Sequence, residues 1–120
     1  MTAQFLLLLS SLLIKSNKFG FLIFARRSGF IIRSFANDLG ASMYGFSQAK
    51  LSGSTLNPFD IFPLNAKHIK ILHKSGNHVV REILILKGKT FFHYEEINLM
   101  LRDGQSESEE LFVKIIFFEG

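Results

Sequence analysis

The four histidines, His68, His73, His78 and His93, have the widest chemical range of any side chains in this sequence. A metal site needs several such ligands to converge, usually with a carboxylate or a cysteine in support. The sequence holds no HExxH pattern, no His/Asp cluster and no cysteine. We therefore expect the histidines on strands and loops, near phosphate or solvent, rather than around a metal ion.

Carboxylates and serines are the other candidates for catalysis. Glu95 and Glu96 are adjacent, but neighbours on a strand point to opposite faces of a sheet, so the two cannot act jointly as acid and base. Residues 107–110 (ESEE) are expected to be a solvated charge run. No serine lies in a G-x-S-x-G motif, and the phosphate-binding GxGxxG and GxxxxGK[ST] motifs are absent. We therefore expect no enzymatic activity.

The basic residues are distributed unevenly. Residues 1–94 carry 12 Lys/Arg against 3 Asp/Glu, a net charge of +9, whereas residues 95–120 carry 2 against 7, a net charge of −5. A body with this charge favours a polyanionic partner, either a nucleic acid or an anionic membrane surface. The acidic end is expected to point away from that partner or to contact a basic protein.

Several short elements would position these charges. Two apolar runs, residues 19–24 and 30–35, flank the turn sequence Arg26-Arg27-Ser28-Gly29 and predict a β-hairpin. Pro58 and Pro63 exclude a continuous helix after residue 51. Residues 79–86 fit a helix capped by Asn77 or a strand equally well. In the order of elements that we expect along the chain, this segment is a helix. Further strands are expected at residues 68–73, 91–101 and 111–118. The pattern indicates a mixed α/β or α+β domain.

The N-terminal apolar run, residues 5–14 (FLLLLSSLLI), is about half the length of a membrane-spanning helix. No Lys or Arg precedes it, and it is not the Arg-rich, amphipathic type of presequence. It fits a short buried element, a membrane or targeting segment, or an extension that docks on a neighbouring protein.

One segment resembles a known family. Residues 43–52 (MYGFSQAKLS) are similar to the M-x-G-F-x-x-A-[KR]-x-S segment of the universal small-subunit ribosomal protein eleven. The hairpin, the run from Ile69 to Gly76 and the pair Arg81-Glu82 follow in that family's order, so that the resemblance covers residues 16–103. The chain departs from the family in its two prolines, where a long helix is usual, and in the absence of the basic tail.

The resemblance implies a three-layer α/β/α fold with a mixed sheet like that of ribonuclease H, here with reduced helices and an extra C-terminal strand. It also implies a division into an apolar extension (1–15), an RNA-binding domain (16–104) and an acidic extension (105–120). The implied function is that of a non-catalytic constituent of the small ribosomal subunit's platform, in the mitochondrial matrix. Its partners would be ribosomal RNA, neighbouring platform proteins and the messenger RNA path. No cofactor is expected beyond Mg²⁺ ions of the RNA.

Basic residues at turns and strand ends are the expected phosphate contacts. Gly45 would allow close approach of the backbone to RNA, and Ser52 would donate a hydrogen bond to a phosphate. The complete set of expected RNA contacts is Lys18, Arg26, Arg27, Arg33, Gly45, Lys50, Ser52, Lys67, Lys70, Lys74 and Arg81.

An alternative class of function follows from the two apolar ends of the chain. The protein would then be a small accessory subunit of an organellar membrane complex, anchored by its N-terminal apolar segment. Association that survives high salt would favour this alternative, and salt-sensitive association would favour RNA.

Overall fold

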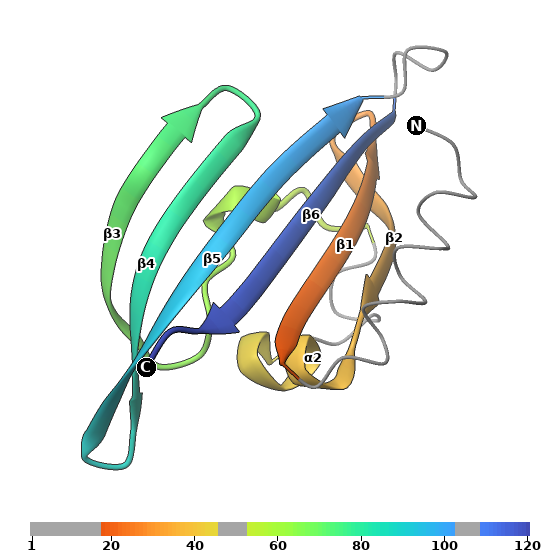
Figure 1. The fold of residues 1–120 in the computed structure, drawn as a ribbon. Coiled ribbons are helices and arrows are strands. Elements are labelled where there is room, and N and C mark those ends of the chain that lie inside the picture. Colours follow the sequence, from red (N-terminus) through yellow and green to blue (C-terminus); the bar gives the residue numbers. More distant parts are fainter. Residues whose placement is uncertain (1–17, 46–52, 103–108) are drawn as a thin grey trace.

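Six strands dominate the described residues, which are 18–45, 53–102 and 109–120 of this computed structural model. All neighbouring strands pair antiparallel, in the order β2-β1-β6-β5-β4-β3 (Figure 1). The C-terminal strand β6 therefore lies inside the sheet, between β1 and β5. The strands are β1 (Phe19–Arg27), β2 (Phe30–Ala36), β3 (Ala66–Ser75), β4 (His78–Lys87), β5 (Thr90–Arg102) and β6 (Glu109–Phe118).

The predicted N-terminal hairpin is confirmed as β1 and β2. Ser28 and Gly29 connect the strands with φ of 52° and 84°. Two consecutive positive φ values match a tight hairpin turn whose twist suits the flanking strands. The strands expected at residues 68–73, 91–101 and 111–118 are also confirmed, as parts of β3, β5 and β6.

Residues 79–86 form a strand, not the helix that the expected pattern contained. Val79, Arg81, Ile83 and Ile85 are buried, while the residues between them are only partly buried. This period of two is that of a strand with unlike faces. The β-branched side chains and the Gly76-Asn77 turn before them also favour a strand. The strand is then stabilised by pairing on both sides, with β3 and β5.

The expected three-layer α/β/α fold with a mixed sheet is wrong for this chain. The described residues contain one α-helix, α2 (Asp38–Tyr44), which is seven residues long, beside a fully antiparallel sheet. Pro58 begins a single turn of 3₁₀ helix, η1 (Pro58–Asp60), in the region where the resemblance implied a long helix. The described residues thus contain no long helix of the kind that usually connects parallel strands.

Helix α2 is fixed to the start of β1 by one side chain. The Asn37 carboxamide oxygen accepts from the backbone N–H of Gly40 at 2.8 Å, as an N-cap, and from that of Phe21 at 3.0 Å. A Cβ on Gly40 would lie 2.4 Å from the Phe21 carbonyl oxygen. The helix therefore packs against the strand backbone through a residue that has no side chain.

The two faces of the sheet bury separate apolar clusters. The larger cluster, with Leu22, Phe24, Ile83 and Ile116, also contains Tyr44 of α2 and packs against Phe59 of η1. Both helices therefore contribute to the same side of the sheet, which we call the core face. The opposite face carries a smaller buried cluster of Phe21, Ile23 and Val113, with Leu99, Leu111 and Ile115 partly buried around it.

Candidate functional site

The three hairpin arginines among the expected RNA contacts form ion pairs with β6. Arg26 donates to Glu110 through Nε at 3.1 Å and Nη2 at 2.9 Å. Arg27 and Arg33 both contact Glu109, at 3.2 and 2.8 Å. Their hydrogen bonds, that of Arg27 first, lower the pKa of the Glu109 carboxyl. These pairs reduce the positive charge that the hairpin presents to a polyanion.

Arg81 lies on the core face and is buried. Its guanidinium pairs with the Glu96 carboxylate, and its Nη1 donates to the Phe59 carbonyl oxygen at 2.7 Å. Its Cζ atom also lies 4.4 Å from the centre of the Phe62 ring. With its donors occupied and its exposure only 5%, this guanidinium does not face a surface ligand.

Glu96 is the centre of a fully buried polar network on the core face. Its carboxylate accepts from the Tyr44 hydroxyl and from Asn98 Nδ2 as well as from Arg81. Lys114 completes the network: its Nζ donates to Asn98 Oδ1 and, at 2.8 Å, to the Pro58 carbonyl oxygen. The network thus joins β4, β5 and β6 to α2 and η1.

Burial changes the protonation behaviour of this network. It lowers the pKa of the Lys114 ammonium to about 7, although Glu96 acts in the opposite direction. Burial also raises the pKa of the Tyr44 hydroxyl well above its usual value, and the neighbouring Glu96 charge adds to that effect. Because Glu96, Asn98 and Lys114 are fully buried, they bind other parts of the chain, and their role is to hold the fold together.

The expected contacts on β3 have a different setting. Lys67, Lys70 and Lys74 are exposed, and β3 is an edge strand that pairs only with β4. Among the described residues none of these three lysines forms an ion pair, in contrast to the hairpin arginines. At a rise of about 3.3 Å per residue they span about 23 Å. The strand itself contains no Asp or Glu.

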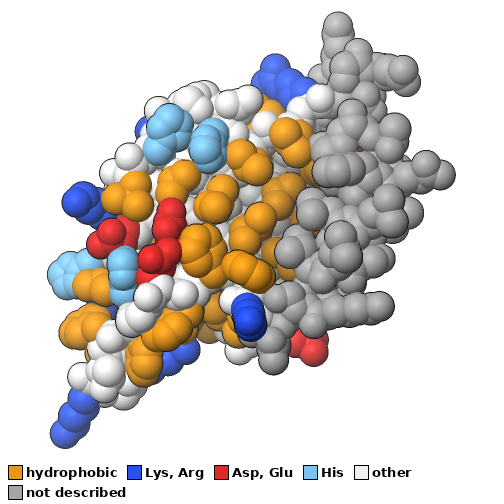
Figure 2. Space-filling model, viewed as in Figure 1, with side chains coloured by type: hydrophobic (Ala, Val, Ile, Leu, Met, Phe, Trp, Pro, Cys, Tyr) orange, Lys and Arg blue, Asp and Glu red, His pale blue; other side chains and the backbone are white. Residues whose placement is uncertain are grey.

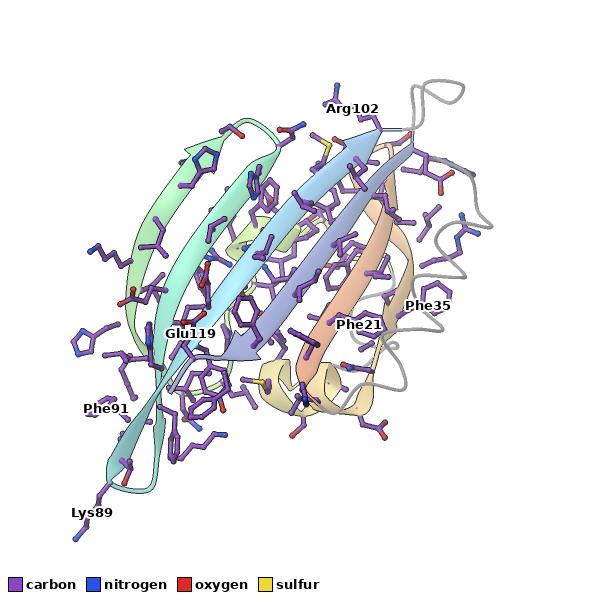
Figure 3. The ribbon with its side chains drawn as sticks, viewed as in Figure 1. Phe21, Phe35, Lys89, Phe91, Arg102 and Glu119 are labelled. Carbon is purple, nitrogen blue, oxygen red and sulfur yellow. The ribbon has the colours of Figure 1, made fainter. Side chains whose placement is uncertain are left out.

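Two ring pairs lie beside these lysines, on the face of the sheet opposite the core face. The ring centres of His73 and His78 are 4.9 Å apart, and those of His68 and Phe91 are 6.2 Å apart. Figure 2 shows histidine side chains near both ends of the β3–β4 edge, with acidic side chains between them. In Figure 3, Phe91 lies beside the lower end of this edge, and Lys89 is at the tip of the β4–β5 hairpin.

The acidic side chains inward of the edge interact with one another and with His93. Glu82 Oε1 lies 3.4 Å from His93 Nε2. A hydrogen bond with Glu119 raises the pKa of the Glu95 carboxyl. The prediction that Glu95 and Glu96 point to opposite faces is confirmed, since Glu96 is buried in the core-face network while Glu95 pairs in register with Glu82 on the other face.

The remaining expected contacts are separated from β3. Gly45 has a φ of 63° and ends α2, its N–H donating to the Ala41 carbonyl oxygen. A Cβ there would lie 3.0 Å from Leu64, so the close backbone approach at Gly45 is internal to the protein. Lys18 precedes β1 and is exposed. Lys50 and Ser52 lie outside the described residues, as does the N-terminal run 5–14.

The ring pairs and the buried network were missed by the sequence reasoning. One signal in the sequence points to the network: Lys114 is the only charged residue in the apolar run 111–118. Glu96 gives no such signal, because polar residues lie beside it at Glu95 and Asn98. The ring pairs depend on the register of β3 with β4 and of β4 with β5, which no local pattern gives.

Compared with known protein families, curated proteins and solved structures, the chain shows no significant match. In the described ranges, no three His, Asp or Glu side chains are grouped so that they could hold a metal ion. None of the helices described here has the length and apolar character needed to cross a membrane.

Proposed function

We propose that this protein is a non-catalytic RNA-binding protein and that β3 is the strand along which the RNA phosphates lie. The observation that carries the proposal is the contrast among the basic residues expected to contact RNA. Lys67, Lys70 and Lys74 are exposed and unpaired within the described residues, whereas the hairpin arginines and Arg81 are paired with carboxylates.

An edge strand is suited to this contact for two reasons. Its outward backbone N–H groups are not used in the sheet, and backbone N–H groups are among the donors that bind phosphate oxygens. Lysine side chains are long enough to reach around the edge from either face, so that all three can contact one RNA backbone. Lysines on an edge also discourage pairing with the strand of another protein.

More specifically, the proposal places the protein in the small ribosomal subunit of mitochondria. It is supported by the resemblance of residues 43–52 to the ribosomal family and not by the fold, which differs from the fold that the resemblance implied. Sedimentation of tagged protein in an organellar lysate tests it. Co-migration with the small subunit that ribonuclease abolishes is the expected result, and migration that is indifferent to ribonuclease would overturn the ribosomal assignment.

Binding of a fluorescently labelled RNA stem-loop, measured by anisotropy at several salt concentrations, tests the role of β3. The triple variant Lys67→Gln, Lys70→Gln, Lys74→Gln should bind more weakly, and the slope of log K against log salt should fall by about two to three units. The matched control, Arg27→Gln, Arg33→Gln, Arg102→Gln, removes the same charge from exposed arginines that have Glu109 or Glu110 as partners. Its slope should change by less than one unit. Equal loss in the two variants would show that only net charge matters, and would contradict the assignment to β3.

A further inference from the structure

We propose that the RNA bound at β3 is single-stranded and that its bases stack on the two ring pairs that flank Lys70. This inference rests on the proposed function and specifies the class of RNA. The two pairs, His73 with His78 and His68 with Phe91, lie toward opposite ends of β3 and on the same face of the sheet.

The sheet register places these rings on one face. His73 is paired with Val80, and His68 with Leu84, both of which lie on the face opposite the core face. Lys70 lies opposite Glu82 in the register of β3 with β4, on that same face and between the two ring pairs. His68 and His73 are five residues apart in sequence, or about 16 Å along an extended strand, which leaves room for a short stretch of extended RNA.

The rings are available to a ligand. Phe91 is 50% exposed, and His68 and His73 are exposed as well. An aromatic ring with half of its surface in water is a favourable platform for a nucleobase, because stacking removes apolar surface from water on both partners. Stacking tolerates any base, since every base has a π face.

The charges around the rings set the orientation of the strand. Lys67 and Lys74 lie on the edge strand β3, whereas Glu82 on β4 and Glu95 on β5 lie inward of that strand, at the level of Lys70 between the two ring pairs. Phosphates would be attracted to the outer edge and repelled from the inner side. The RNA backbone is therefore placed along β3, with its bases directed inward over the rings.

A duplex does not fit this arrangement. In an A-form helix the bases are already stacked on one another, and the groove that displays their edges is read by shape and by 2′-hydroxyl contacts. The rings could reach bases only in an unpaired strand, a loop or a bulge. Lysines combined with stacking rings are the usual means by which proteins hold single strands without reading their sequence.

The test compares a labelled single-stranded RNA with a duplex of the same length, on the full chain. The variant His68→Ala, Phe91→Ala should bind the single strand about fivefold to 150-fold more weakly, with its salt slope unchanged. The control variant Phe30→Ala, Phe35→Ala removes two rings on β2 that are each 50% exposed, as Phe91 is, and should leave affinity unchanged. A second variant, His73→Ala, His78→Ala, tests the other ring pair independently, and thermal unfolding checks that each variant is folded.

The outcomes separate this inference from the proposed function. If the lysine variant loses affinity while the ring variants do not, or if duplex and single strand bind equally well, the single-strand inference is overturned and RNA binding along β3 stands. If wild-type protein binds neither RNA, the proposed function itself fails. Preference for the single strand together with loss in both ring variants supports the inference.

Discussion

At the scale of single residues, the buried network shows how charge is used inside a small sheet. Glu96 is an acceptor for three side chains, and Lys114 uses two donors on the Pro58 carbonyl and the Asn98 carboxamide. Removing one member of a buried charge pair leaves its partner without compensation and typically costs about 3–5 kcal/mol. We therefore expect these residues to affect the proposed RNA binding only through the fold.

The shifted pKa of Lys114 predicts a dependence of stability on pH. Folding lowers this pKa from about 10.4, the value for an unfolded chain, to about 7. Between these two values the unfolded state binds more protons than the folded state, so the free energy of unfolding rises with pH. Urea unfolding at pH 7, 8 and 9 should show a rise of about 1 kcal/mol per pH unit.

Substitution tests the assignment to Lys114. Lys114→Met should remove this rise, because methionine does not titrate, whereas Lys70→Met on the exposed edge should keep it. Measurements stop at pH 9 because the raised pKa of Tyr44 reverses the dependence at higher pH. A rise that persists in Lys114→Met would assign the pH dependence to another group.

At the scale of elements, the contact between α2 and β1 determines how the core face is closed. Gly40 lies against the Phe21 backbone, and Asn37 ties both segments together. Tyr44, at the end of the helix, then reaches Glu96 in the sheet. The helix is too short to be stable alone, so its position depends on these contacts.

Gly40→Ala should be strongly destabilising, by more than 2 kcal/mol, because the added methyl group would meet the Phe21 backbone and force the helix away from the strand. Gly76→Ala is the matched control, since a Cβ at Gly76 has no atom within 4 Å. Chemical unfolding of the two variants measures the difference. Equal stability of Gly40→Ala and wild type would mean that α2 does not pack on β1 as described.

The elements also show what the sequence could predict. The β1–β2 hairpin and the strands within β3, β5 and β6 follow from apolar runs bounded by turn residues. Residues 79–86 were ambiguous because a short β-branched run fits both periods, and pairing with β3 and β5 decided the outcome. The expectation of a three-layer fold rested on a resemblance in short motifs, and such motifs carry no information about strand order.

At the scale of the whole molecule, the order of the strands in the sheet decides which basic residues have acidic partners. The division of the chain into a basic and an acidic part does not. The acidic residues of β6 neutralise the arginines of β1 and β2 because β6 lies next to β1 in the sheet. Sequence position alone could not reveal this, since the residues of each pair are more than 70 positions apart. The unpaired basic residues that remain on β3 are at the opposite edge of the sheet, which is why β3 is the proposed RNA contact.

Cross-linking of the full chain to a single-stranded RNA that contains photoreactive uridines tests this central claim most directly. The linked peptides would be identified by mass spectrometry, with the paired hairpin as an internal reference. We predict links at the β3–β4 edge, in residues 66–78, and at Phe91. Links confined to residues 26–33, or a pattern spread evenly over all basic segments, would contradict the account.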